Sequence, residues 1–138
     1  MTLHETNQQQ VYTHEFVVQP TEIDVMGHVN NVVYLKWVQD AAEAHWLNKA
    51  SDEVKKKFSW VVLRHEIDYL SPTFEGQTIV ATTWVDKFSG VKSDRIVELK
   101  LKESNKLIAK ARTTWCLLDS VTMRPKRIEG EIVNVFGT

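Results

Sequence analysis

One short segment of the sequence, from Asp24 to Asn31, holds a carboxylate, an imidazole, a glycine and two adjacent amides. A carboxylate can attack a carbonyl carbon directly, or it can take a proton from a water molecule that does so. The two amides stand where a helix is predicted to begin, and the free N–H groups of a helix N-terminus stabilise negative charge on an oxygen. The segment therefore has the groups needed to cleave an acyl bond.

The remaining residues of this segment have less specific roles. His28 follows Asp24 closely enough to orient its carboxylate or to protonate a leaving group, although a purely structural role fits equally well. Gly27 permits backbone conformations that residues with a side chain avoid. Taken alone, an aspartate, a glycine and two asparagines ahead of a helix are also typical of a turn followed by an N-cap. The local sequence leaves both interpretations open.

A long helix is predicted directly after this segment, because apolar residues recur at helical spacing over residues 30–49. Asn30 is the expected N-cap, since its side-chain oxygen can accept a free N–H of the first turn. A second, short helix is predicted over residues 52–58, with Ser51 as its cap. The apolar face of the long helix is predicted to hold Val33, Trp37, Ala41, Ala44 and either Trp46 or Leu47.

The rest of the chain favours β-strands. A strand is predicted over residues 11–19, where Pro20 ends it, and beyond residue 59 the apolar spacing becomes alternating. The residues expected on one face of that next strand are Val61, Leu63, Ile67 and Tyr69. Three further strands are predicted over residues 77–88, 93–103 and 106–118.

Short turns between these strands rule out parallel pairing, which needs a long crossover between neighbouring strands. The sheet must therefore be mainly antiparallel. A helix with one apolar side needs a cover, which a strongly curved sheet provides. The sequence thus predicts an α+β domain in which a curved sheet of five to six strands wraps one long central helix.

The run DVMGHVNNVVY, from Asp24 to Tyr34, resembles a known signature. It is similar to that of the 4-hydroxybenzoyl-CoA thioesterase-like branch of hotdog acyl-CoA hydrolases, and to that of plant-type acyl-ACP thioesterases. The likeness continues at residues 62–72, 75–77 and 109–115, in the family's order. One departure is Met26, where the acyl-ACP enzymes have an asparagine thought to join the catalytic set. A thioether cannot take that role.

The resemblance implies a hotdog fold and hydrolysis of an acyl-CoA to a free acid and CoA, without a cofactor or metal. It implies that a loop aspartate acts as nucleophile or general base while a helix N-terminus polarises the carbonyl. The implied catalytic residues are Asp24, His28 and Asn31. The expected substrate-binding residues are Gly27, Asn30, Tyr34, Arg64 and Arg112. The two arginines could contact CoA phosphates, although a solvated position on the surface fits each of them as well. Alternatives on the same fold are a hydratase or dehydratase of acyl thioesters and a non-catalytic acyl-thioester binding protein.

Assembly and organisation follow from the same reasoning. No linker divides the chain, so we expect a single domain over residues 1–138, with residues 1–8 frayed. An open sheet has a long edge strand that is normally paired or protected. The resemblance implies a homodimer, or a dimer of dimers, with one continuous sheet and two composite active sites.

Composition limits the partners and the compartment. The net charge of −1 gives no basic surface for nucleic acid, and no apolar run is long enough to span a membrane. Cys116 is the only cysteine in the sequence, which rules out an intramolecular disulfide and a multi-cysteine zinc site. A cytoplasmic protein is therefore expected, with acyl-CoA as its small-molecule partner.

Overall fold

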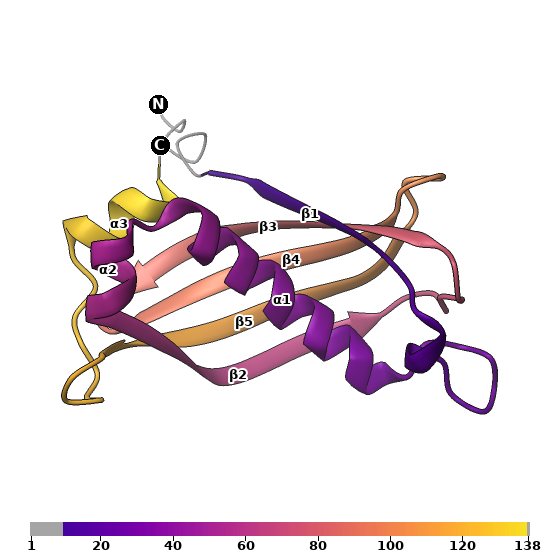
Figure 1. The fold of residues 1–138 in the computed structure, drawn as a ribbon, viewed down its shortest axis with the longest axis horizontal. Helices are drawn as coiled ribbons and strands as arrows, with labels where there is room; N and C mark the ends of the chain where they lie inside the picture. The colour runs from indigo at the N-terminus through magenta and orange to yellow at the C-terminus, as the bar shows by residue number, and fades with distance from the viewer. Residues whose placement is uncertain (1–9, 138) are drawn as a thin grey trace.

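The computed structural model describes residues 10–137 and contains one curved, five-stranded antiparallel sheet with a long helix across one face (Figure 1). The strand order is β1-β3-β4-β5-β2, so β1 and β2 form the two edges. This arrangement confirms the predicted α+β class with its mainly antiparallel sheet. The strands are β1 (Tyr12–Val17), β2 (Phe58–Tyr69), β3 (Thr78–Ser89), β4 (Lys92–Leu101) and β5 (Leu107–Asp119).

The long helix α1 (Asn31–Lys49) begins as predicted, because the Asn30 side-chain oxygen accepts the Val32 N–H at 3.0 Å. Its buried residues are Tyr34, Trp37, Val38, Ala41, Ala42 and His45. The predicted face is confirmed, with Trp46 and not Leu47 as its last residue, but it was incomplete. Leu47 is 52% exposed, while Tyr34 and His45 are buried because hydrogen bonds satisfy their polar atoms. An apolar pattern alone does not find such residues.

Strand β2 also departs from the prediction. Its register against β5 shifts between Val62 and Arg64, which is the signature of a β-bulge. The extra residue breaks the alternation of faces along the strand. Val61 and Leu63 are consequently exposed, whereas Ile67 packs against the core under α1. The predicted single apolar face from Val61 to Tyr69 is wrong for this reason.

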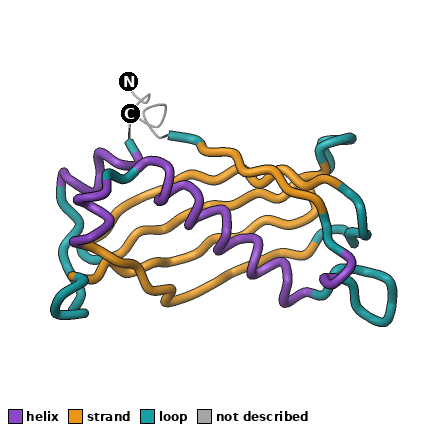
Figure 2. Tube along the Cα trace, in the orientation of Figure 1, coloured by secondary structure: helices purple, strands orange, loops and turns teal. Residues whose placement is uncertain are grey.

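Three shorter helices complete the described chain (Figure 2). The short 3-10 helix η2 (Pro20–Glu22) precedes the turn at Asp24. The predicted second helix is confirmed as α2 (Asp52–Lys57), with the Ser51 hydroxyl capping the Val54 N–H. The unpredicted α3 (Gly130–Phe136) packs beside α2 at one end of the sheet, where both contribute to a second hydrophobic cluster.

The described helices include none that is long and apolar enough to cross a membrane. The expectation of a frayed terminus over residues 1–8 concerns residues outside those described. At the opposite end of α1 from α2 and α3, the connection from β1 forms a projecting loop (Figure 1). That loop carries the segment from Asp24 to Asn31 and brings it to the first turn of α1.

Candidate active site

A tight turn from Asp24 to His28 forms the base of the candidate site. The Asp24 N–H donates to the His28 carbonyl at 2.8 Å, and the Gly27 N–H donates to the Asp24 carbonyl at 3.0 Å. Gly27 has a φ of +84°, in the left-handed region that a residue without a side chain enters without strain. The short sequence between these residues therefore closes on itself and fixes the position of Asp24.

The carboxylate of Asp24 is held by one of its two oxygens. Oδ1 accepts the Met26 N–H at 2.9 Å and the His28 N–H at 3.3 Å. Oδ2 accepts no hydrogen bond from the residues that the structure describes. One oxygen thus orients the group while the other keeps its lone pairs for a substrate or a water molecule.

Glu22 ties this turn to α1. Its Oε1 accepts the Gln19 N–H at 2.8 Å and its Oε2 accepts the Trp37 indole N–H at 3.0 Å. Its backbone carbonyl accepts the Asn30 N–H at 3.2 Å. Sequence reasoning missed this positioning residue. The sequence pattern that could have identified it is a glutamate three residues after Gln19, which is the spacing of a capping box.

The first turn of α1 supplies a backbone donor. The Val32 N–H is capped by Asn30, and the Val33 N–H donates to the Asn30 carbonyl at 2.9 Å. The N–H of Asn31 has no hydrogen-bond partner within residues 10–137. Because it also lies at the positive end of the helix dipole, it is suited to bind a negatively charged oxygen.

Tyr34 and the segment after β2 form the opposite wall. The Tyr34 hydroxyl lies 2.7 Å from Thr73 Oγ1, and the Thr73 carbonyl accepts the Val29 N–H at 2.9 Å. Burial raises the pKa of Tyr34, against the opposing effect of its Thr73 hydrogen bond, so the hydroxyl stays protonated. Tyr69, at the end of β2, donates from its hydroxyl to the Asn31 carbonyl at 3.5 Å. Thr73 and Tyr69 were not among the predicted site residues.

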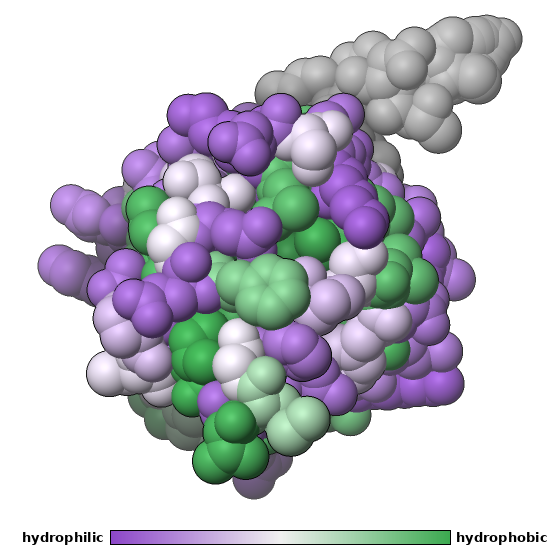
Figure 3. Space-filling view, turned by 90° about the vertical axis from the view of Figure 1, so that its right-hand side faces the viewer, coloured by the Kyte–Doolittle hydropathy of each residue, from purple (hydrophilic) through white to green (hydrophobic). Residues whose placement is uncertain are grey.

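These elements enclose a pocket of about 460 Å³. It brings together five of the predicted residues, namely Asp24, His28, Asn30, Asn31 and Tyr34. Gly27 belongs to the adjoining turn but does not line the pocket. Val25 and Met26, at the tip of the turn, are exposed. On the surface at this end of the molecule, hydrophobic residues lie between hydrophilic ones (Figure 3).

His28 contributes to the site mainly through its backbone. Its N–H and its carbonyl both bond to Asp24, as described above. Its imidazole is exposed and packs edge-on against Phe74, with the ring centroids 5.2 Å apart. In this arrangement the backbone of His28, and not its ring, orients the Asp24 carboxylate.

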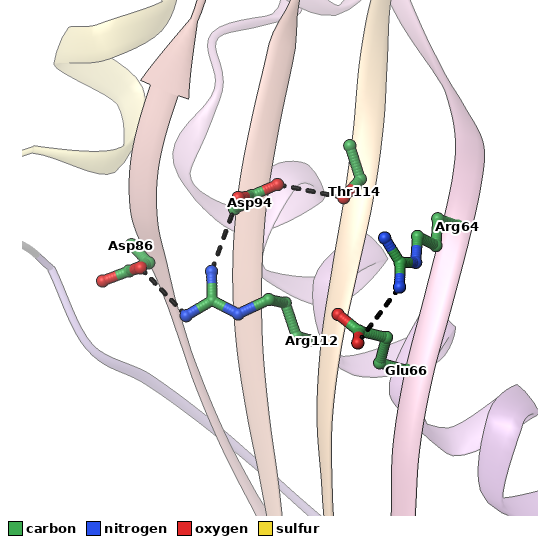
Figure 4. Close-up of polar contacts among 6 residues, drawn as sticks. All are labelled: Arg64, Glu66, Asp86, Asp94, Arg112 and Thr114. Atoms are coloured by element: carbon green, nitrogen blue, oxygen red, sulfur yellow. Dashed lines mark hydrogen bonds and ion pairs between the residues drawn. The ribbon is translucent and has the colours of Figure 1, made fainter.

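The two predicted arginines lie outside this pocket, on the face of the sheet that α1 does not cover (Figure 4). Arg64 on β2 pairs with Glu66 at 3.2 Å. Arg112 on β5 is held between Asp86 at 3.1 Å and Asp94 at 3.4 Å. Each guanidinium therefore has an acidic partner on the sheet and keeps some of its N–H donors exposed. No group of His, Cys, Asp and Glu side chains among the described residues could hold a metal ion.

Comparison with known proteins places the chain in a family. The sequence profile of the Thioesterase-like superfamily matches residues 18–136. The chain belongs to this superfamily. It is also 24% identical over 117 residues to the long-chain acyl-CoA thioesterase FadM of Escherichia coli (strain K12), covering 83% of this chain and 89% of FadM. The predictions of a thioesterase family and of a thioester hydrolase are confirmed at the level of the family.

Solved structures agree with this assignment. The probable thioesterase YbaW from Escherichia coli superposes with a TM-score of 0.79 at 22% identity, covering 89% of this chain and 94% of YbaW. The 1,4-dihydroxy-2-naphthoyl-CoA thioesterase Slr0204 from Synechocystis superposes with a TM-score of 0.79 at 18% identity, covering 91% and 95%. These likenesses confirm the predicted hotdog fold.

Proposed function

We propose that this thioesterase-superfamily member hydrolyses acyl-CoA thioesters to a free acid and CoA in the pocket around Asp24. The proposal rests on one observation. A hydrogen-bond acceptor and a hydrogen-bond donor, neither of which has a partner among the described residues, belong to the same pocket. They are the Asp24 Oδ2, which can act on the carbonyl carbon, and the Asn31 N–H, which can bind the carbonyl oxygen. Attack and charge stabilisation are the two requirements of acyl cleavage.

Two routes use these groups in the same positions. In one, Asp24 Oδ2 attacks the thioester carbon, the C–S bond breaks, and water hydrolyses the resulting anhydride. In the other, Oδ2 takes a proton from a water molecule that attacks the same carbon. In both routes, the Asn31 N–H stabilises the oxygen as it gains charge, and one such donor is typically worth about 2.7–4 kcal/mol. CoA leaves as a thiolate, which needs little help from the exposed His28 imidazole.

The relatives support acyl-CoA as the substrate class. FadM is a long-chain acyl-CoA thioesterase and Slr0204 a 1,4-dihydroxy-2-naphthoyl-CoA thioesterase, so their acyl groups differ while the CoA thioester is shared. The part of this site built by Asp24 and the helix N-terminus contacts only the thioester group. The predicted contacts of Arg64 and Arg112 with CoA phosphates stay predictions, and the proposal does not depend on them.

We also propose that the active unit is a homodimer paired through β2, with a dimer of dimers as the larger form. β2 is an edge strand on which Val61 and Leu63 are exposed. Its last residue, Tyr69, lines the Asp24 pocket, so a second copy paired along β2 would lie beside that pocket. Molar mass by light scattering tests this, with about twice the 16.0 kDa of the chain, or about four times, as the expected result. A monomer at assay concentration would contradict it.

A thiol-release assay across short, long, branched and aromatic acyl-CoAs tests the function. We expect release of free CoA from at least one class, with the unmodified acid as the second product. Mass spectrometry of the products separates the alternatives, because a hydratase or dehydratase would change the acyl chain and leave CoA attached. Tight binding without turnover across the whole panel would instead indicate a non-catalytic binding protein and overturn the proposal.

A further inference from the structure

A second cavity, of about 370 Å³, lies at the other end of α1 and shares no lining residue with the Asp24 pocket. Residues of α2 and α3 contribute to its lining. These two helices lie at the end of the sheet opposite the Asp24 turn (Figure 1). Its lining comes from the second half of α1, from α2 and α3, and from β2, β4 and β5. It therefore joins segments that are far apart in the sequence.

Arg95, on β4, is the unusual residue of this cavity because it is only 4% exposed. Its Nη1 donates to His45 Nδ1 at 2.9 Å and to Thr83 Oγ1 at 3.0 Å, and its guanidinium lies 5.0 Å from the Phe136 ring centroid. None of these partners is an acid. Within the described part of the chain, Arg95 forms no salt bridge, and its Nε and Nη2 donate no hydrogen bond.

His45 does not balance this charge, because burial, aided by Arg95 and Lys49, lowers its pKa to about 3. It is a neutral acceptor at physiological pH. Burial also lowers the pKa of Arg95 to about 9, which still leaves the guanidinium charged at neutral pH. A buried cation without a counter-ion is unfavourable, and a bound anion would remove that cost.

Three further polar atoms around the same cavity have no partner. Ser59 Oγ, Trp60 Nε1 and Trp115 Nε1 are buried, and no described residue forms a hydrogen bond with them. Each of the two indole nitrogens can only donate, and the hydroxyl can donate as well. Neighbouring atoms cover all three completely, so a ligand in the cavity does not reach them, and Arg95 is the donor available to it. A water molecule could accept hydrogen bonds but would not neutralise the cation.

The residues that line the cavity indicate the chemical character of the uncharged part of the ligand. They are largely aromatic, with Trp46, Phe58, Trp60, Trp115 and Phe136 among them. Flat rings pack favourably against such walls, and the cavity has the volume of a small-molecule site. Of the lining residues within 10–137, Glu43 is the only acid, and it is exposed and forms no ion pair with Arg95.

We propose that this cavity binds a small aromatic carboxylate whose oxygens accept hydrogen bonds from the Nε and Nη2 groups of Arg95. The proposal is independent of the function assigned to Asp24, since the two pockets have no residue in common. The ligand's ring lies between the indole and phenyl side chains. Its charge, and not its ring alone, determines the affinity.

Calorimetric titration with 2-naphthoate and with the uncharged 2-naphthamide tests the proposal on the full chain. We expect the carboxylate to bind about tenfold or more tightly than the amide, because only the carboxylate compensates the Arg95 charge. Arg95→Met should remove this preference. Trp115→Phe keeps an aromatic ring in the wall and leaves Arg95 in place, so it should retain the preference for the carboxylate.

The location of binding is tested by the indole N–H resonances of the 15N-labelled protein. The signals of Trp60 and Trp115 should shift when 2-naphthoate is added. Two tryptophans serve as internal controls, because Trp37 is bonded to Glu22 and Trp84 lines a different pocket. Their signals should stay in place.

Three outcomes would overturn the proposal. They are equal affinity for the carboxylate and the amide, no binding of either, or shifts confined to tryptophans outside the cavity. Asp24→Asn should bind 2-naphthoate as the wild type does, so a loss of binding in that variant would assign the ligand to the Asp24 pocket instead. If Arg95→Met does not fold, the pair of ligands and the Trp60 and Trp115 signals of the wild type still decide the result.

Discussion

The two ends of α1 carry pockets that are built in opposite ways. At the N-terminal end, the Asp24 carboxylate lies on an open turn whose own backbone N–H groups hold Oδ1. At the C-terminal end, Arg95 is buried and its charge has no counter-ion among the described residues. The first pocket satisfies its polar groups locally and leaves one oxygen free. The second leaves a whole charge uncompensated inside the protein.

The difference shows what each kind of site requires. A reacting carboxylate needs orientation and access, both of which a short exposed turn can supply. A buried cation that binds a ligand must be kept out of water by the fold around it. Changes at the turn should therefore affect activity, whereas changes around Arg95 and His45 should affect stability and ligand binding.

Among changes that leave the Asp24 side chain itself in place, Gly27→Val should have the largest effect on activity. A β-branched residue at a φ of +84° is strained, so the turn should open and move the Asp24 carboxylate. A displacement of about 1 Å is enough to reduce the rate about 100-fold. The measurement is kcat/KM for the best acyl-CoA of the panel.

Gly90→Val is the matched control for this change. Gly90 also has a positive φ, of +63°, and like Gly27 it has open space where a side chain would begin. It lies in the turn between β3 and β4, outside the Asp24 pocket. The control should lose stability but keep its kcat/KM within about twofold. Equal losses of activity in both variants would show that the Asp24 turn has no special role.

A smaller effect is expected on stability, from the titration of His45. Its pKa is about 3 in the folded protein against 6.5 for the ordinary side chain, so between these values only the unfolded chain binds the proton. Stability is thus present above pH 6.5 and is lost as the pH falls. Between pH 7 and pH 5 this single group should lower the free energy of unfolding by about 2 kcal/mol.

Urea unfolding of the wild type and of His45→Gln at both pH values measures this contribution. The glutamine does not titrate, so the drop in stability between the two pH values should be about 2 kcal/mol smaller in the variant. If the wild type and the variant showed the same pH dependence, His45 would not be held neutral in the folded protein. The description of the C-terminal end of α1 as a site of uncompensated charge would then be contradicted.

The sequence was most informative where structure depends on neighbouring residues. The N-caps at Asn30 and Ser51 and the alternation in β4 each follow from residues close together in the chain, and all three are present. The bulge after Val62 and the burial of Tyr34 and His45 on α1 were not predictable in the same way. They depend on which residues meet across the sheet, and a single sequence does not contain that pairing.

The same distinction applies to the sites. Asp24, Asn30, Asn31 and Tyr34 are contiguous with the helix start, so one motif located them together. The wall from Tyr69 to Pro72, and Thr73 behind it, come from a distant segment, and sequence reasoning did not place them in the site. The Arg95 cavity was invisible for the same reason, because a lone arginine in a strand pattern gives no sign that it will be buried without an acid.

The most direct test of the central claim is the kcat/KM of Asp24→Asn, with the fold verified by circular dichroism. Asparagine keeps the shape of the side chain but can neither attack the thioester nor take a proton from water, so we expect a loss of at least about 100-fold. Asp40→Asn, on the exposed side of α1 where Asp40 pairs with Lys36 at 2.9 Å, makes the same chemical change outside the pocket and should retain full activity. A folded Asp24→Asn protein as active as the wild type would contradict the account.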